Sequence, residues 1–349
     1  MAPKSSRLTP FSDETVLALA KHMHWFFSPV DLDEKNKTVG INHTMHTEWT
    51  LYHFILYLQN KHILQEALLY SNQIHSLARK LVNAGILHSL GYLGQTPMFD
   101  EGFFSMKELT ELESVSDFWL SGILGERYLR NLTKGFIVRI EGTTRDAAKT
   151  SATGSGVLIA NNLILTCAHN INDIEISAVC REEEELHIIS KKPHPEIDLG
   201  IIEVQPTYDA EIYPYFGDAY VLDKTLTMGY PPARGMRGTP LIAQSGEINA
   251  IEKELFTGSQ CITISSTTRP GNSGGPVFSL NGYIVGIVIS SATAVEQYGV
   301  DFEKHEEQIQ PLRDTKQETP FYLALSSQEI NARIHEIDPN ITLRYEMYK

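Results

Sequence analysis

The hydrophobic pattern changes once along the chain, near residue 133, and this change limits the fold that each part can adopt. Before it, apolar residues recur at helical spacing, most clearly over residues 44–82. After it, apolar runs are short and β-branched, and Gly, Asn and Pro separate them. We therefore predict a multidomain α+β protein. An α-helical domain covers residues 1–132, and an all-β domain with a short C-terminal helix covers residues 133–349.

Local signals divide the first part into several helices. Apolar positions favour one helix over residues 13–27 and one or two amphipathic helices over residues 44–82. At Ser105 the order Ser-Met-Lys-Glu fits a capping box, which predicts a further helix starting there. The order Ser-Ser-Gln-Glu at Ser326 carries the same signal, and it predicts the start of the C-terminal helix.

A glycine-rich turn stands out in the second part. Residues 271–276 read Gly-Asn-Ser-Gly-Gly-Pro, and the apolar run 283–288 follows. Because glycine adopts backbone angles that other residues avoid, this turn can expose the Ser273 hydroxyl beside several backbone N–H groups. Such a turn suits acyl transfer, in which the serine attacks a carbonyl and N–H groups hold the oxyanion. By itself, the segment reads equally well as a hairpin turn.

Two upstream residues decide between these interpretations. His169 ends a pair of predicted strands over residues 154–169, and Asp198 lies where a loop enters the next apolar run. Alone, the histidine is most simply a core residue and the aspartate a turn residue. Together with Ser273, in the order His, Asp, Ser, they supply a general base, its orienting carboxylate and a nucleophile.

Several segments between residues 135 and 330 resemble a known family. They include Thr-Cys-Ala-His ending at His169, Asp-Leu-Gly-Ile starting at Asp198, and the turn around Ser273; the full set is 154–157, 162–166, 168–169, 198–201, 228–231, 267–277 and 285–287. In these segments the chain resembles the trypsin-like (chymotrypsin-fold) serine proteases, nearest the bacterial HtrA-type and V8 glutamyl endopeptidase-type branch. The resemblance implies a double β-barrel with the site in its cleft. It also implies a His169, Asp198 and Ser273 triad, with an oxyanion hole from the amides of Gly271 and Ser273.

The resemblance also bears on specificity. Thr267 falls where trypsin has its pocket aspartate, so a preference for Lys or Arg is not implied. Thr268 matches a pocket threonine of the V8-type enzymes, but Val288 stands in place of their partner histidine, which favours a neutral residue over glutamate. The last residues of this strand would pair with the substrate backbone. The predicted substrate-binding set is Thr267, Thr268, Val288, Ile289, Ser290 and Ser291.

Asn272 bears on activation. Zymogen-activated trypsins have an aspartate at this position, which pairs with a new amino terminus after cleavage. An asparagine cannot form that ion pair, and no activation sequence is recognised near Gly135. We therefore predict activity without trypsinogen-type processing.

A polar insertion interrupts the β pattern at residues 292–319. It lies beside the expected substrate cleft, and either a plain surface loop or a lid fits its composition.

Metal and cofactor binding are not expected. Most of the 13 histidines lie in the first part, and the pairs His22/His24 and His43/His46 have a spacing that metal sites use. They have no accompanying cysteines and no His-Glu-x-x-His motif, so scattered imidazoles are the simpler interpretation. We predict no metal and no cofactor.

Charge and cysteine usage limit partners and location. The net charge of −14 disfavours nucleic acid as a partner. The three cysteines suggest no disulfide framework, and neither a signal-peptide core nor a membrane-spanning run is evident. We expect a protein without a transmembrane segment, either cytoplasmic or exported without a classical signal peptide, as a delivered effector would be.

The predicted function is that of a serine endopeptidase performing limited processing of protein or peptide substrates. The helical domain is expected to dock a partner protein, regulate the cleft or direct localisation. A different class of function is a catalytically silent, protease-like interaction module, which would act through the cleft or the helical domain. An esterase using the same triad is a third reading.

Overall fold

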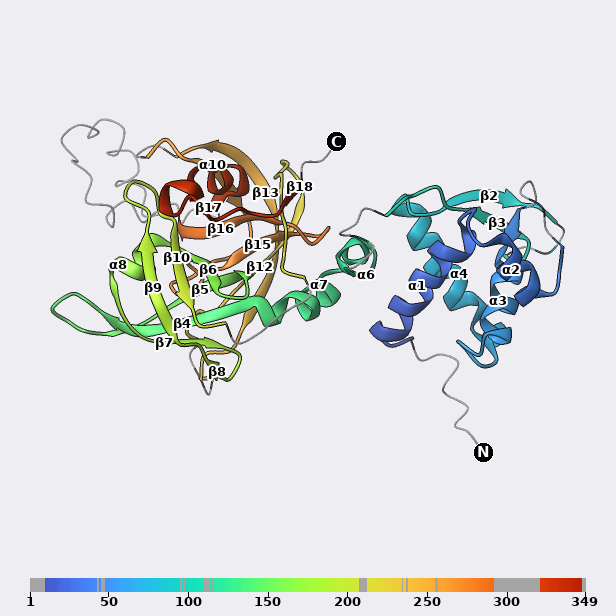
Figure 1. Cartoon of the computed structure of the whole chain (residues 1–349), viewed down its shortest axis with the longest axis horizontal. Helices are drawn as coiled ribbons and strands as arrows, with labels where there is room; N and C mark the ends of the chain where they lie inside the picture. Colours follow the sequence, from blue (N-terminus) through green and yellow to red (C-terminus); the bar gives the residue numbers. More distant parts are fainter. Residues whose placement is uncertain are drawn as a thin grey trace. The chain divides into compact units, whose positions relative to one another are not determined.

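The computed structural model describes residues 10–346 except 43, 45–47, 95, 97, 110–112, 114, 115, 207–211, 234, 237, 255, 256 and 292–320. The predicted insertion at 292–319 lies outside the described residues. The chain forms two compact units, Met1–Gly125 and Glu126–Lys349 (Figure 1). The predicted domain boundary at 132/133 falls seven residues later. It marks the end of helix α7 (Glu126–Thr133), which belongs to the second unit, where Glu126 accepts a hydrogen bond from Ser245.

The first unit combines helices with a small sheet. Ser12 caps α1 by accepting a hydrogen bond from the Thr15 amide at 3.2 Å, and Thr50 caps α3. The strands form one antiparallel sheet in the order β1-β3-β2. The elements are α1 (Asp13–Phe27), α2 (Leu32–Val39), β1 (Trp49–Thr50), α3 (Leu51–Asn60), η2 (Ala67–Tyr70), α4 (Ser71–Asn83), β2 (His88–Tyr92), β3 (Glu101–Phe104), η3 (Phe118–Leu120) and α6 (Ser121–Leu124).

Aromatic side chains form the core of the first unit. Phe26 lies at a ring-centroid distance of 5.4 Å from Phe54, and Phe27 lies 5.3 Å from Phe103. All four side chains are almost fully buried. Burial of each such ring contributes about 2–3 kcal/mol relative to exposure. These rings come from α1, α3 and β3, so the first unit has a core of its own.

The helix predicted to start at Ser105 is wrong over residues 105–109, which have no regular structure. Ser105 is buried at the end of β3, where its Oγ donates to the Ile86 carbonyl at 2.8 Å and its amide donates to the Phe27 carbonyl at 2.9 Å. The serine side chain therefore satisfies a distant carbonyl and does not cap a helix. The described residues of the range 44–82 include the two helices α3 and α4, as predicted, with β1 before α3 and η2 before α4.

The second unit contains two large sheets and a short C-terminal helix, which confirms the predicted double β-barrel fold class. The first sheet has the order β8-β7-β4-β5-β6-β10-β9, and the second has the order β15-β12-β13-β14-β17-β16-β11-β18. Ser326 caps α10 by accepting from the Glu329 amide at 3.1 Å, as its capping box predicts. Figure 1 shows α10 beside β16 and β17.

The bounds in the first sheet are β4 (Ile137–Thr144), β5 (Ser151–Ala160), β6 (Leu163–Thr166), β7 (Ile174–Arg181), β8 (Glu184–Glu185), β9 (Ile188–Pro193) and β10 (Gly200–Val204), with α8 (Ala168–Asn172) after β6 and η4 (Lys134–Phe136) before β4. The bounds in the second sheet are β11 (Phe216–Gly217), β12 (Lys224–Gly229), β13 (Ile242–Lys253), β14 (Gln260–Ile264), β15 (Pro276–Ser279), β16 (Ile284–Ser291), β17 (Tyr322–Ser326) and β18 (Tyr345–Glu346), with α10 (Ser327–Ile337) after β17.

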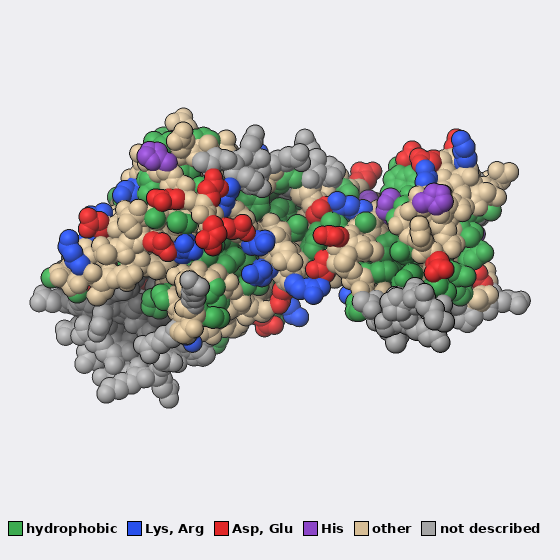
Figure 2. Space-filling model, turned by 90° about the horizontal axis from the view of Figure 1, so that it is seen from below, with side chains coloured by type: hydrophobic (Ala, Val, Ile, Leu, Met, Phe, Trp, Pro, Cys, Tyr) green, Lys and Arg blue, Asp and Glu red, His purple; other side chains and the backbone are tan. Residues whose placement is uncertain are grey.

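β-Branched side chains fill the core of the second sheet, among them Ile248, Ile262, Val277 and Val285. Short runs of this kind suit strands buried on a pleated face. On the face drawn in Figure 2, acidic and basic side chains are interspersed over the described surface of this unit. No helix in the described part of the chain is both long and apolar enough to cross a lipid bilayer.

Candidate active site

The first sheet brings His169 and Asp198 together. β6 leads through Cys167 into the first turn of α8, which holds His169, while Asp198 lies in the loop between β9 and β10. β6 and β10 are antiparallel neighbours with Thr166 opposite Gly200, so the end of β6 meets the start of β10. One oxygen of Asp198 accepts from the His169 amide at 3.0 Å, and the other lies 2.8 Å from His169 Nδ1.

One Asp198 oxygen therefore orients the imidazole, and the other holds the backbone of the same residue. Burial lowers the pKa of His169, but the hydrogen bond and charge of Asp198, with the charge of Asp173, raise it, and the net shift is upward. The His169 side chain remains 34% exposed while that of Asp198 is 7% exposed. Since Nδ1 faces the carboxylate, Nε2 is the nitrogen left for another partner.

The serine turn is held by main-chain bonds to β16. The Gly274 amide donates to the Val288 carbonyl at 2.7 Å, and the Val288 amide donates to the Gly275 carbonyl at 2.9 Å. The Ser273 hydroxyl donates to the Ile289 carbonyl at 3.4 Å. In the described structure no hydrogen bond joins this hydroxyl to His169. The histidine–aspartate pair is thus assembled, while the hydroxyl uses a main-chain acceptor.

Residues of β5 and α8 also hold the serine turn. The Ser273 carbonyl accepts from the Ser155 amide at 2.9 Å and from Asn170 Nδ2 at 2.8 Å. Asn170 is the neighbour of His169 in α8, and its Nδ2 also lies 3.0 Å from Thr166 Oγ1. These bonds place the serine turn next to α8, the helix that holds His169.

Sequence reasoning did not assign a role to Ser155, Thr166 or Asn170. All three side chains are buried, with Ser155 and Thr166 completely so. Ser155 and Thr166 lie in β5 and β6, where a polar residue inside an apolar run is the signal that could have found them, because a buried hydroxyl requires a partner. Asn170 lies in α8 and has no such signal. Their partners lie in segments distant along the chain, so the pairing itself was not readable from the sequence.

A second turn precedes Ser273. The Asn272 amide donates to the Arg269 carbonyl at 2.9 Å, and Gly271 has φ of +101°. With Pro270 at the second position, these features define a type II turn, whose third residue needs positive φ. A Cβ at Gly271 would lie 2.8 Å from neighbouring main chain, so only glycine fits. The Gly271 carbonyl accepts from Ser155 Oγ at 2.6 Å, which fixes the turn.

The amides of Gly271 and Ser273 are the predicted oxyanion donors. Within the described part of the chain, neither amide donates to a backbone carbonyl. Asn272 between them is buried, and its Oδ1 would lie 2.8 Å from a Cβ at Gly229. Its side chain therefore packs into the protein beside β12.

The predicted substrate-binding residues lie along β16 and just before the serine turn. Thr267 is exposed and Thr268 is buried. The Val288 side chain packs in the core of the second sheet, and the Ile289 side chain is also buried. Ser290 pairs with Leu323 and Ser291 with Tyr322, both in β17.

On the edge away from β17, β16 pairs with described strands over only part of its length. β15 pairs with β16 only as far as Pro276 opposite Ile287, and the turn residues continue to Val288. Beyond Val288, no described strand pairs with this edge of β16. The edge can therefore accept an extended peptide as an added strand.

Cys167 lies beneath the site. Its thiol donates to the Val288 carbonyl at 3.1 Å, and complete burial, with the nearby Asp198, raises its pKa well above the ordinary value. The thiol therefore stays protonated and packs as a small buried group.

Three side chains of the site also lie close enough together to hold a metal ion. Among the described residues, the metal-binding atoms that lie within 4.8 Å of one another belong to Cys167, His169 and Asp198. The hydrogen bonds above account for these three groups. His22 contacts Tyr57 and His24 contacts the Lys107 carbonyl, while His43 and His46 lie outside the described residues.

A histidine–aspartate pair at the edge of one β-sheet, beside a glycine-rich serine turn of a second sheet, is the arrangement that chymotrypsin-fold serine peptidases share. Residues 154–287 match the family described as the trypsin-like peptidase domain. This match lies in the part of the chain whose motifs resemble the HtrA-type serine proteases.

The curated relatives include DegP-like serine endoproteases. The probable periplasmic DegP-like serine endoprotease of Brucella suis is 29% identical over 143 residues, which cover 39% of this chain and 27% of that protein. The DegP-like protein of Bartonella henselae is 33% identical over 143 residues, with the same coverage of 39% and 27%. The chain therefore spans little more than a quarter of the length of these relatives.

Solved structures of proteases are also similar. An M. tuberculosis protease in its active form has a TM-score of 0.45 and 17% identity, with 62% of this chain and 86% of that chain covered. The serine endoprotease from Yersinia pestis has a TM-score of 0.44 and 18% identity, with 61% and 66% covered.

Proposed function

We propose that the second unit hydrolyses peptide bonds of protein substrates through a triad of His169, Asp198 and Ser273. The observation that carries this proposal is the double contact of Asp198 with His169, at 3.0 Å to the amide and 2.8 Å to Nδ1. This contact sets the tautomer in which Nδ1 carries a proton and Nε2 is a free base. Such a nitrogen next to a serine turn can accept a proton.

The reaction proceeds in two halves. The Ser273 hydroxyl rotates from the Ile289 carbonyl to His169 Nε2, gives up its proton and attacks the substrate carbonyl. Nε2 then returns the proton to the leaving amine, which departs and leaves an acyl-enzyme. Water repeats the sequence and regenerates Ser273, while Asp198 stabilises the imidazolium throughout.

The amides of Gly271 and Ser273 hold the oxyanion of each tetrahedral intermediate. A single donor of this kind contributes about 3 kcal/mol to the transition state. Two features support this role. The type II turn, with its positive φ at Gly271, fixes the orientation of the Gly271 amide, and neither the Gly271 nor the Ser273 amide has a backbone acceptor among the described residues.

The open edge of β16 would bind the substrate backbone at Ile289–Ser291, next to Ser273. Thr267 carries no charge, so a neutral side chain before the scissile bond is expected. A site that requires an extended segment at a strand edge suits limited processing at exposed loops of protein substrates. Mapping of new amino termini with wild type and Ser273→Ala would identify the cleaved sequences.

A serine-directed fluorophosphonate tests the proposed activity. The full-length protein should be labelled, and Ser273→Ala or His169→Ala should abolish labelling. The hydroxyl's contact with Ile289 instead of His169 favours one second candidate, a catalytically silent protease-like module. That candidate predicts no labelling of the wild type in any state, even when a bound peptide is present. Comparison of peptide and ester turnover would separate a peptidase from an esterase.

Activity of the uncut chain is part of this proposal. Asn272 cannot form the ion pair that activates trypsinogen, and its side chain is already buried. Full-length protein should therefore cleave peptides without processing near residue 135. Protein that is inert until it is cut there would contradict this.

The first unit is proposed as a docking, regulatory or targeting module that binds a partner protein. It has its own aromatic core and exposes Leu90 and Tyr92 on the edge strand β2. Leu90→Ser with Tyr92→Ser should weaken partner capture and leave turnover of a short peptide unchanged. Loss of peptide turnover would point instead to direct control of the active site.

The thiols of Cys167, Cys180 and Cys261 are all free. We propose a compartment that keeps thiols reduced, either the cytoplasm of the producing cell or that of a cell receiving the protein. The DegP-like relatives are named periplasmic, so cell fractionation with alkylation of free thiols tests the difference directly.

A further inference from the structure

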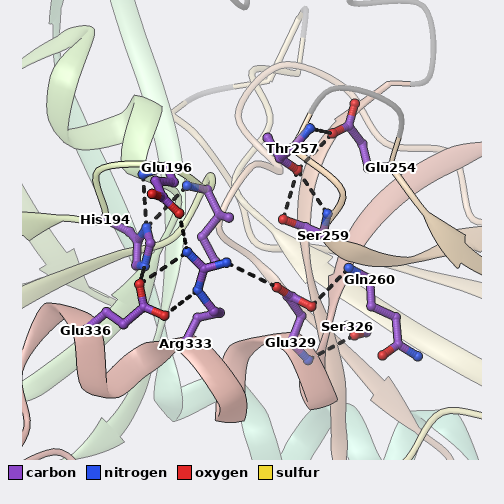
Figure 3. A network of polar contacts seen from close by, with 11 residues as sticks. His194, Glu196, Glu254, Thr257, Ser259, Gln260, Ser326, Glu329, Arg333 and Glu336 are labelled. Atoms are coloured by element: carbon purple, nitrogen blue, oxygen red, sulfur yellow. Dashed lines mark hydrogen bonds and ion pairs between the residues drawn. The ribbon is translucent and has the colours of Figure 1, made fainter.

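The loop that carries Asp198 is folded around a buried imidazole (Figure 3). The His194 side chain is completely buried, and its Nδ1 accepts from the amides of Glu196 at 3.1 Å and Ile197 at 3.2 Å. The His194 amide donates to the Leu199 carbonyl at 2.7 Å, which closes the loop. Asp198 thus lies between residues that this imidazole or its backbone hold.

These contacts set the tautomer of His194. Because two amides donate to Nδ1, this nitrogen is unprotonated, and Nε2 carries the proton. Nε2 lies 3.2 Å from Glu336 Oε2 in α10 and donates to it. Every polar atom of the ring is therefore used, which a buried group requires.

The C-terminal helix fastens this loop from outside. Arg333 of α10 forms an ion pair with Glu196 and lies 3.2 Å from Glu336, with Nη2 making both contacts. α10 is itself anchored on the second sheet, because Glu329 accepts from the Gln260 amide at 3.1 Å (Figure 3). A helix that follows β17 thus holds a loop that precedes β10.

We propose that His194 is a positioning residue for Asp198, and that α10 acts with it through Glu336 and Arg333. His194 keeps the loop 194–199 in the shape that places both Asp198 oxygens on His169. The role in catalysis rests on the proposed function, whereas the effect on the Asp198–His169 contact does not.

The His169 ring reports this role. The described groups that set its charge are Asp198 and Asp173, with the buried thiol of Cys167 beside the pair. Asp198 raises the pKa of His169 against the effect of burial. If the loop loosens, the carboxylate retreats and the pKa of His169 must fall. General damage to the fold would lower the active fraction and leave this pKa unchanged.

The experiment compares four variants of the full chain. His194→Ala removes the acceptor of both loop amides. His194→Asn restores an acceptor, because the asparagine side-chain oxygen can accept hydrogen bonds from the amides two and three residues further along the chain. Glu336→Ala removes the fastening in α10, and Asp338→Asn is the matched control, since Asp338 of the same helix end pairs with Lys192 and not with the loop. Each variant is titrated by NMR with labelled histidine, and its pH profile of kcat/KM is recorded.

His194→Ala should lower the pKa of His169, shift the acid limb of kcat/KM to lower pH, and reduce kcat roughly 100-fold with little change in KM. His194→Asn should recover most of both effects, Glu336→Ala should show a smaller shift in the same direction, and Asp338→Asn should match wild type. An unchanged His169 titration in folded His194→Ala would overturn the proposal. If that variant does not fold, an unchanged titration in Glu336→Ala overturns it. An inactive wild type with a shifted His169 titration would refute the proposed function alone.

Discussion

Each compact unit contains a buried carboxylate in contact with a histidine, and the two pairs are used in different ways. In the first unit, Glu101 lies 2.6 Å from His75 Nε2, and its other oxygen accepts from Ser89 Oγ at 2.7 Å and pairs with Arg79 at 3.1 Å. In the second unit, both oxygens of Asp198 contact His169. The first carboxylate is shared among three side chains, whereas each oxygen of the second contacts the same residue, His169.

The consequence lies in the nitrogen that each ring has left. His75 contacts the Glu101 carboxylate through Nε2. No described serine turn lies next to His75. His169 contacts the Asp198 carboxylate through Nδ1, which leaves Nε2 available to a partner beside the Ser273 turn. A histidine–carboxylate contact alone is therefore a structural feature of both units. A candidate active site is distinguished by the ring nitrogen that remains available and by a serine turn beside it.

The largest expected effect is that of Asp198→Asn, which keeps the size of the side chain and changes its hydrogen bonding. The amide cannot hold the Nδ1-protonated tautomer, so kcat for a peptide substrate should fall by roughly 10⁴-fold. Glu101→Gln is the matched control and should leave kcat unchanged. Equal losses of activity in the two variants would show that the pairs do not differ in the way we describe.

Glu101→Ala should instead destabilise the first unit. The substitution leaves a cavity and strands Ser89 and His75, and a broken buried pair costs about 3 kcal/mol. The three tryptophans, Trp25, Trp49 and Trp119, all lie in the first unit, so urea unfolding followed by tryptophan fluorescence reports this unit. The midpoint should move to lower urea with peptide turnover retained below it. A midpoint equal to that of wild type would mean that Glu101 is dispensable for stability.

The pH dependence of activity should reflect the raised pKa of His169. The proposed mechanism needs the neutral imidazole, so activity is present above the pKa of His169 and is lost as the pH falls through it. Since Asp198 raises this pKa above the ordinary 6.5, the acid limb of kcat/KM should lie above that value. In Asp198→Asn the residual activity should have its limb at lower pH. If the acid limb of Asp198→Asn lay at the same pH as that of wild type, the group that titrates would not be His169.

The smallest effect is expected for His75→Gln. A glutamine amide can still donate to Glu101 from the same helix, so the free energy of unfolding should change by about 1 kcal/mol or less. Peptide turnover and its pH profile should be identical to wild type. A changed profile would indicate that His75 influences the site, contrary to the structural role assigned to it.

Much of the architecture was predictable because its signals are local. Helical spacing before residue 133 and short β-branched runs after it indicated the fold class, and the serine turn was recognisable from its glycines. Ser326 and Ser105 show that a local signal does not always predict the structure that forms. Both begin the pattern Ser-x-x-Glu, yet Ser326 caps α10 while Ser105 is drawn to the Ile86 carbonyl. A capping box states only what the side chain could bind, and the packing around it selects the acceptor.

The sequence alone determined the order of His169, Asp198 and Ser273 and the backbone freedom of the turn around the serine, since residue type and local spacing are properties of the chain itself. Only the tertiary structure decided that β6 lies against β10 in the register that joins Asp198 to His169. It also decided that Ser155 and Asn170 hold the Ser273 carbonyl, and that His194 and α10 brace the aspartate loop. These contacts join residues distant along the chain, and strand register and buried hydrogen bonds between such residues form only when the sheets pack.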